Sequence, residues 1–398
     1  MTKMRPTLSV LAASLLIAGG AAAQDVAITN ARIVVGTGTV IDSGTVIVRG
    51  GKIVFVSPGA ANTQGLKTID GKGLTAMPGF IDAHKHVNTG PNEKAQMQAL
   101  LEAGYTTILS GGGPGEGNIT LRDRIDTGVI NGPRIIPSER VAIRNTTPEK
   151  ARAEIRQMAA RGIRHTGEIS LTPEPGPTAE EIAILEAIVD EAAKAGVQVN
   201  VHAVSTPAMV AAMDAGVRRL VHLPNKDWVT RAAAQKVAAT GSIVLGTIGF
   251  GAPIFGVFAE DNLARFRDGK PWPESIVGAN RVEGAPIGTE AGYAMVNART
   301  VWDAGGLVGY CTDTGYEPRA GLEHELKSYS IVMSMADIFT LMGPNTAAYI
   351  GMSDQLGTLE AGKLADIILV AGNPLEGIHN MINSKVVLKG GVVVVDKR

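Results

Sequence analysis

The sequence contains a single cysteine, Cys311, among its 398 residues. One cysteine cannot form an internal disulfide, so a disulfide-stapled fold is excluded and cysteine usage does not indicate the redox compartment. The sequence also lacks an excess of charge of one sign, because 37 Lys and Arg residues stand against 38 Asp and Glu residues. Without a basic excess that could neutralise phosphates, we expect no nucleic-acid partner.

The apolar run near the N-terminus is too short to cross a membrane. It extends from Leu8 to Ala18, roughly a dozen residues, whereas a spanning helix needs about 20. Lys3 and Arg5 precede this run, and small residues ending at Ala23 follow it. Because this order is typical of a secretory signal, we predict a signal peptide over residues 1–23. The mature protein is then periplasmic or secreted, with no stable membrane insertion.

Both ends of the chain are rich in short β-type segments broken by glycine. These segments are Ala31–Val35, Gly44–Val48 and Lys52–Val56 near one end, and Ala365–Val370, Lys385–Leu388 and Val392–Val395 near the other. Such segments predict strands joined by turns. Two β-rich ends around a different middle predict one small β-sandwich domain built from residues 24–73 and 357–398.

The middle of the chain repeats another pattern, in which a helical stretch ends at glycine and an apolar strand follows at once. The glycines are Gly104, Gly162, Gly196, Gly216, Gly241 and Gly306. Glycine just past a helix adopts the left-handed conformation at low cost, so each marks a helix end. Alternating helices and apolar strands predict an α/β fold with a parallel sheet, either a closed barrel or a doubly wound open sheet, over residues 74–356.

The chemistry-bearing residues favour the closed barrel. A first strand from Leu74 ends at His84 and His86, and the spacing of two puts both imidazoles on one face, where they can bind one metal ion. Ligand-type side chains follow four further strands, namely Glu168, His202, His222 and Asp313. Taken singly, each histidine can be a core residue and Asp313 a helix cap. Gathered at the ends of several strands, they are typical of a (β/α)8 TIM barrel.

Two segments resemble the amidohydrolase superfamily. Pro78–His86 is similar to the first-strand signature of that superfamily, and Gly357–Ile367 is similar to its return into the β domain. The resemblance implies a binuclear metal centre with ligands on strands one, four, five, six and eight. Many relatives bridge their metals with a carboxylated lysine on strand four. No lysine lies between Lys150 and Lys194, so the resemblance to the enamidase branch implies Glu168 as the bridge.

The resemblance implies hydrolysis of a C–N bond in an amide or cyclic amide. Two divalent ions, expected to be zinc with iron or manganese as alternatives, share a hydroxide that attacks a small-molecule substrate. His84, His86 and Asp313 hold one ion, His202 and His222 hold the other, and Glu168 contacts both. Asp313 is the expected catalytic proton carrier. The alternatives are a metallo-dipeptidase resembling prolidase and a non-catalytic metal-binding protein, and a homo-oligomer is left open.

Several further residues are candidates for substrate contact. The long segment 249–299 is a candidate lid, because long loops in compact domains often bind ligands. Lys226 and Arg319 follow strands six and eight and could meet a substrate carboxylate, and His324 could reach the pocket rim. The glycine-rich run Gly111–Gly117 lacks the ending of a phosphate-binding loop, so we expect a flexible loop at the barrel mouth.

Overall fold

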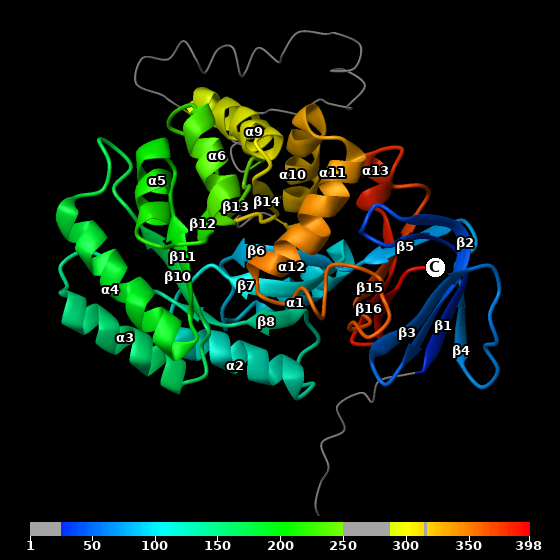
Figure 1. Ribbon diagram of the computed structural model, residues 1–398. Helices are drawn as coiled ribbons and strands as arrows, with labels where there is room; N and C mark the ends of the chain where they lie inside the picture. The colour runs from blue at the N-terminus through cyan, green and yellow to red at the C-terminus, as the bar shows by residue number, and fades with distance from the viewer. Residues whose placement is uncertain (1–24, 250–286, 314–316) are drawn as a thin grey trace, which may run out of the picture.

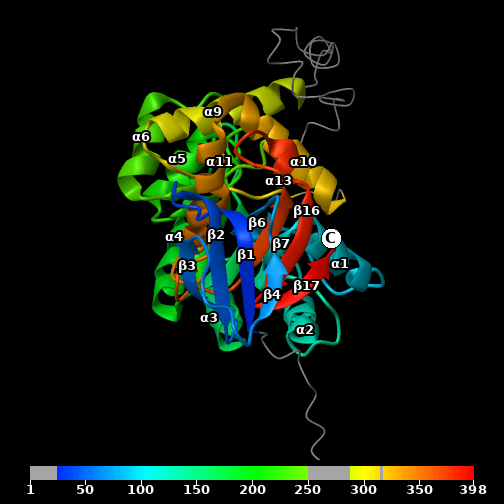
Figure 2. The same ribbon diagram turned by 90° about the vertical axis from the view of Figure 1, so that its right-hand side faces the viewer.

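The computed structural model describes residues 25–249, 287–313 and 317–398, which form a β domain beside a (β/α)8 barrel (Figure 1). The predicted signal peptide over residues 1–23 and most of the candidate lid at 249–299 lie outside the described residues. In Figure 2 the N-terminal strands in blue and the C-terminal strands in red lie side by side. The β domain is therefore assembled from both ends of the chain.

One eight-stranded sheet forms the β domain. Its path runs β17-β16-β15-β5-β1-β2-β3, and β4 pairs with β1 off this path. The strands are β1 (Val26–Val34), β2 (Val40–Arg49), β3 (Lys52–Pro58), β4 (Lys67–Asp70), β5 (Leu74–Pro78), β15 (Ile367–Ala371), β16 (Ser384–Lys389) and β17 (Val392–Asp396). Buried side chains from both chain ends, such as Val46, Ile53, Ile367 and Val386, share one core. Because this core joins residues far apart in sequence, neither end can form the domain alone.

Parallel strands form the barrel wall in two hydrogen-bonded groups. The strands are β6 (Phe80–Lys85), β7 (Tyr105–Ser110), β8 (Arg134–Ile136), β9 (Ser138–Glu139), β10 (His165–Ser170), β11 (Gln198–His202), β12 (Arg219–Val221), β13 (Ile243–Leu245) and β14 (Leu307–Gly309). Strands β6-β7-β8 form one group and β14 to β9 the other, and Pro137 separates β8 from β9, which together make the third barrel strand. The Ala83 N–H donates to Tyr310 O at 3.3 Å and the Asp313 N–H to His84 O at 2.9 Å, so the eighth strand closes onto the first.

Helices cover the outside of the barrel (Figure 1). Within the described residues they are α1 (Glu93–Ala103), α2 (Gly115–Asp126), α3 (Pro148–Ala160), α4 (Ala179–Ala195), α5 (Thr206–Asp214), α6 (Arg231–Thr240), α9 (Ile287–Asp303), α10 (Pro318–Val332), α11 (Met335–Thr340), the π-helix η1 (Leu341–Asn345) and α12 (Thr346–Tyr349). A further helix, α13 (Ile378–Met381), packs against β15 of the β domain and against α10. Gly104, Gly196 and Gly241 end their helices at left-handed φ values of 102°, 66° and 64°, which confirms the predicted helix ends.

The strand predicted to run from Leu74 to His86 is in fact two strands in different sheets. β5 pairs with β15 and β1 in the β domain, whereas β6 pairs with β7 in the barrel. They separate at Gly79, where a Cβ would lie 2.4 Å from the Thr106 side chain. The barrel was predicted to start at residue 74. The strand that starts there, β5, pairs with strands of the β domain instead.

A buried ion pair joins the two domains. Arg134 on β8 donates to Asp366 at 2.7 Å, and the Asp366 side chain is only 2% exposed. The same carboxylate accepts the Gly390 N–H at 2.8 Å, and the Asp366 carbonyl accepts the Gly79 N–H at 2.9 Å. Asp366 thus fixes the β domain against the barrel at the point where β5 gives way to β6.

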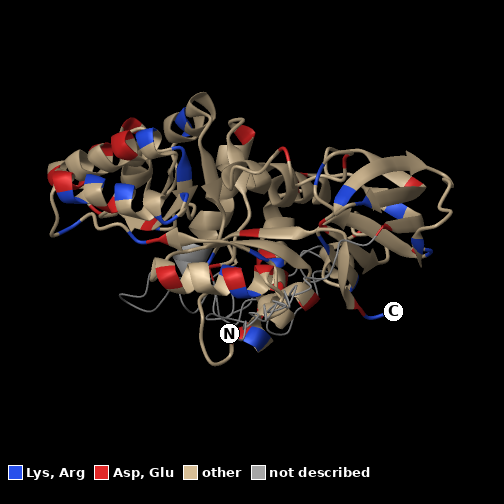
Figure 3. Ribbon diagram, turned by 90° about the horizontal axis from the view of Figure 1, so that it is seen from below, with Lys and Arg blue, Asp and Glu red and all other residues tan. Residues whose placement is uncertain are grey.

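The charged residues of the described chain are mixed in sign. Figure 3 shows Lys and Arg interspersed with Asp and Glu along the helices of the barrel. Within the described residues, no helix is both long enough and apolar enough to cross a membrane.

Candidate metal centre

All six predicted ligand residues lie at the C-terminal ends of barrel strands. His84 is on β6 and His86 follows it directly, Glu168 is on β10, His202 ends β11, His222 follows β12, and Asp313 follows β14. Their side chains converge because parallel barrel strands all end at one rim. The structure therefore brings together residues that are up to 229 positions apart in the sequence.

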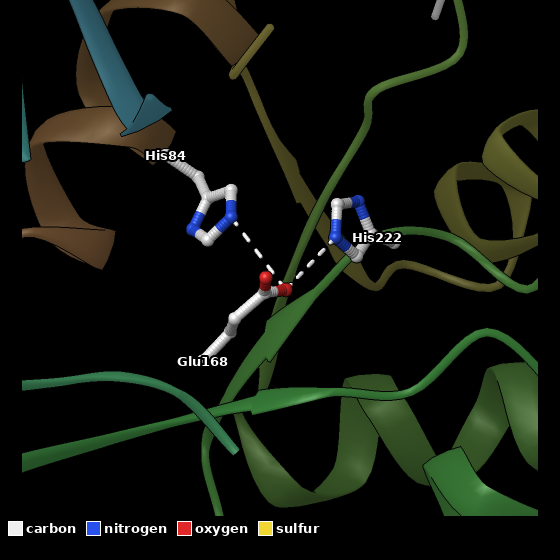
Figure 4. A group of neighbouring side chains, drawn as sticks. All are labelled: His84, Glu168 and His222. Atoms are coloured by element: carbon white, nitrogen blue, oxygen red, sulfur yellow. Dashed lines mark hydrogen bonds and ion pairs between the residues drawn. The ribbon is translucent and has the colours of Figure 1, made fainter. Parts of the chain in front are cut away.

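The Glu168 carboxylate lies at the middle of the cluster. Its Oε2 accepts from His202 Nδ1 at 2.7 Å and from His222 Nε2 at 3.2 Å, and it lies 3.6 Å from His84 Nε2. Its other oxygen, Oε1, lies 3.5 Å from His86 Nε2. Figure 4 shows His84 and His222 pointing toward Glu168 from opposite sides. One carboxylate thus faces all four imidazoles, as a bridging ligand requires.

Asp313 lies across from Glu168 and faces three of the same rings. Its Oδ1 is 3.4 Å from His84 Nε2 and 3.2 Å from His86 Nε2, and its Oδ2 is 3.6 Å from His222 Nε2. Two sets of ligand atoms lie within 4.8 Å of one another, His84 with His86 and Asp313, and His84 with Glu168 and His222. His202 belongs to neither set, although it contacts Glu168 directly.

The donor set fits divalent cations. His84 Nε2 is buried and has no hydrogen-bond partner among the described residues, although two carboxylates lie 3.4 Å and 3.6 Å from it. A buried polar atom without a partner is costly, and a metal ion satisfies it. Imidazole nitrogens and carboxylate oxygens together suit zinc, iron or manganese.

The electrostatics of the centre keep both carboxylates ionised. Burial raises the pKa of Glu168, but hydrogen bonds from His202, His222 and His86 outweigh it and hold that pKa well below its usual range. Burial also raises the pKa of Asp313, but hydrogen bonds from His84 and His86 outweigh burial. The pKa of Asp313 therefore lies below its usual range. For His222, burial is the larger influence, and its pKa is lowered.

Two of the ligand rings are oriented by neighbouring groups that the sequence analysis did not identify, one on the backbone and one on a side chain. His86 Nδ1 hydrogen-bonds to Gly112 O at 3.3 Å, and His222 Nδ1 to Thr247 Oγ1 at 2.7 Å. Such contacts fix the tautomer and direction of a ligand ring. Thr247 follows β13, the seventh barrel strand, and its position at a strand end is the signal that could have identified it.

The glycine-rich run corrects one expectation. Gly115 begins α2, so only the first part of the run is a loop. Gly111 lies against the ligand histidines, because a Cβ there would be 2.9 Å from His84 Cε1 and 2.9 Å from His86 Nε2. The Glu168 N–H also donates to Gly111 O at 3.2 Å. Gly111 is therefore part of the wall of the metal centre.

The remaining polar candidates lie around the centre rather than in it. Lys226 and Arg319 are exposed, and His324 is on α10, where burial lowers its pKa. His165 is buried, and burial together with Arg219 lowers its pKa to about 3. His165 is therefore neutral and belongs to neither set of ligand atoms.

A cavity of about 440 Å³ opens between the segment after β9 and α3. Arg140, Val141 and Met158 are among its lining residues, whereas none of the six predicted ligands is. This cavity is therefore distinct from the metal centre.

A (β/α)8 barrel that gathers histidines and carboxylates at the C-terminal rim of its strands is the arrangement expected of a metal-dependent enzyme. Comparison with family models identifies the family, since the Amidohydrolase family model matches residues 93–395. The chain belongs to the amidohydrolase family, which is metal-dependent and acts on amide-type bonds.

Individual relatives cover different parts of the chain. Imidazolonepropionase of Alkaliphilus metalliredigens is 26% identical over an alignment 404 positions long, which covers 90% of this chain and 91% of that protein. Adenine deaminase of Desulforamulus reducens is 37% identical over 101 residues, only 25% of this chain and 17% of that protein. A solved structure described as a prolidase, from Bifidobacterium longum, has a TM-score of 0.76 and 26% identity, covering 95% and 97% of the two chains.

Proposed function

We propose that the protein hydrolyses a C–N bond in an amide or cyclic amide other than a peptide bond. The observation that carries this proposal is the placement of two ionised carboxylates, Glu168 and Asp313, among four imidazoles at the rim of the barrel. A relative of nearly equal length, imidazolonepropionase, supports the choice of a non-peptide substrate.

The ligand atoms would hold two divalent cations, with zinc as the first choice. His84, His86 and Asp313 form one compact set, and His202 and His222 approach Glu168 from the other side. Glu168 presents one oxygen to each side and would bridge them. When bound, such cations lower the pKa of a water molecule and polarise a carbonyl group.

Asp313 is suited to carry the proton of the reaction. Its lowered pKa keeps the carboxylate ionised at neutral pH, so it can accept a proton from the attacking water. Nitrogen is a poor leaving group unless it is protonated. In our proposal the protonated Asp313 carboxyl then donates to the leaving nitrogen. His222 is held neutral by burial and oriented by Thr247, so it serves as a ligand and not as the acid.

A dipeptidase is the second candidate. The prolidase from Bifidobacterium longum, with 26% identity over nearly the whole chain, favours it. It would use the same ligands and the same Asp313 chemistry, so the two candidates differ only in substrate.

Metal analysis and a substrate screen test the proposal. Protein reconstituted separately with zinc, iron and manganese is assayed on cyclic amides, N-acyl amino acids and dipeptides. We expect about two ions per chain at full activity and turnover of a non-peptide amide. One ion in the fully active enzyme would contradict the binuclear centre. Turnover of dipeptides alone would establish the second candidate instead.

A further inference from the structure

Arg140 stands at the rim of the barrel beside the metal centre. It follows β9 directly, at the C-terminal end of the third barrel strand, where barrel enzymes bind substrates. A Cβ built on Gly112 would lie 3.2 Å from Arg140 Cγ, and the Gly112 carbonyl holds His86 Nδ1. On the other side, a Cβ on Gly167 would lie 3.3 Å from the Arg140 N, next to Glu168. Arg140 therefore packs on residues adjoining two ligands.

The charge of Arg140 is not neutralised within the described part of the chain. Its side chain is exposed, and among the described residues it makes neither an ion pair nor a hydrogen bond. The nearby carboxylates are engaged elsewhere, since Glu139 pairs with Arg161 and Glu154 accepts the Ala142 N–H at 3.2 Å. A planar guanidinium with free donors is the group best matched to a carboxylate.

The surroundings of Arg140 leave room for a ligand. The side chain packs on Gly112 beside the metal centre and also lines the cavity of about 440 Å³ between β9 and α3. A cavity of that volume is large enough for a small molecule. Arg140 is thus the residue that both lines this cavity and packs on Gly112, whose carbonyl holds the ligand His86.

We propose that Arg140 binds a carboxylate of the substrate and selects anionic amides over neutral ones. This inference rests on the proposed hydrolysis of amides and deepens it by naming the substrate class as amides that bear a carboxylate. An exposed arginine is usually a solvated surface cation. Arg231 on α6 is also exposed and has no described side-chain partner, but it lacks the contacts with residues adjoining metal ligands.

The test compares N-benzoylglycine with N-benzoylglycinamide, which differ in the carboxylate. For metal-loaded protein, KM is measured where turnover occurs and Kd by calorimetry where it does not. We expect the parent to favour the acid by about 10- to 100-fold, as for hydrogen bonds to a charged group. Arg140→Gln should abolish this preference by raising KM or Kd for the acid, while the value for the amide changes little. Arg140→Lys should keep part of the preference, because its ammonium retains the charge. Arg231→Gln should behave as the parent.

Each contrary outcome has a distinct meaning. If the parent binds neither ligand or does not distinguish them, or if Arg140→Gln keeps the preference, the inference is wrong. If Arg140→Gln keeps the preference for the acid, the metal ions bind the carboxylate. If Arg319→Gln loses that preference, Arg319 is the residue that binds the carboxylate. Equal loss on both ligands would indicate a structural role. An Arg140-dependent preference without turnover of any amide would refute the proposed hydrolysis and leave this inference standing.

Discussion

Replacing Asp313 with Asn separates the two roles proposed for that residue. Asp313 has a left-handed φ of 47°, a conformation that Asn tolerates better than most residues, so the backbone should not move. The amide oxygen can take the place of Oδ1, which lies 3.2 Å from His86 Nε2, but the amide cannot carry the proton. The variant therefore removes proton transfer while it keeps the shape of the site.

The expected loss follows from the size of general acid-base catalysis. Removing such help costs about 10²- to 10⁴-fold in rate, which corresponds to about 3 to 5 kcal/mol in barrier height. We expect kcat of Asp313→Asn to fall by this factor while the metal content stays near that of the parent. His202→Ala provides the contrast, because it deletes the ring that donates to Glu168 at 2.7 Å and should lose metal together with activity.

The assay is kcat with metal stoichiometry by elemental analysis on both variants. An Asp313→Asn enzyme with full metal and near-parental kcat would refute the proton-carrier role, and His324 would be the next residue to examine. Loss of metal in Asp313→Asn would instead mean that its charge, and not only its oxygen, is needed to hold the ion.

Three further predictions concern the wall of the site, the domain contact and the N-terminus. Gly111→Ala should weaken metal affinity by about 10- to 100-fold in a metal titration, because its Cβ would push the His84 and His86 rings, whereas Gly90→Ala, with open space around it, should bind metal as the parent does. Asp366→Asn should lower the free energy of unfolding by about 3 kcal/mol in urea, because it leaves Arg134 without its buried partner, and Asp42→Asn, whose side chain is 88% exposed, should cost under about 1 kcal/mol. Export with signal removal predicts a mature protein that begins at Gln24; an intact mass that retains residues 1–23 would contradict it.

The fold was predictable where the evidence is local. Helix ends at Gly104 and Gly196, and the capping box of Thr178 with Glu181, depend on neighbouring residues and could be read from the sequence. The division at Gly79 could not, because this single residue separates β5 from β6 and no turn signal in the sequence shows that the two strands belong to different sheets. Which sheet each joins depends on pairing with strands as distant as β15, and only tertiary contacts decide it.

The residues of the candidate site also fall into those that the sequence could predict and those that it could not. The six ligand-type residues stand out because each lies toward the end of a barrel strand or soon after it, and the barrel geometry then brings them together. Gly111, Gly112 and Thr247 also follow barrel strands, but a glycine or a threonine at a strand end has many ordinary roles, so position alone did not single them out. Strand alternation also fails within β10, where the register shifts between His165 and Glu168. Counting residues along a regular strand therefore cannot say which side chains of β10 share a face.

The backbone at the rim explains why residue identity could be predicted but side-chain direction could not. His222, Thr247 and Asp313 follow three successive strands, β12, β13 and β14, and have left-handed φ values of 68°, 54° and 47°. Each such residue other than glycine costs on the order of 1–3 kcal/mol and persists only where the surrounding structure enforces it. Here the enforcing contacts include the bond from His222 Nδ1 to Thr247 and the bond from the Asp313 N–H to His84 O. The strain is thus maintained by the same contacts that aim the ligands, so the cluster is organised by the barrel itself.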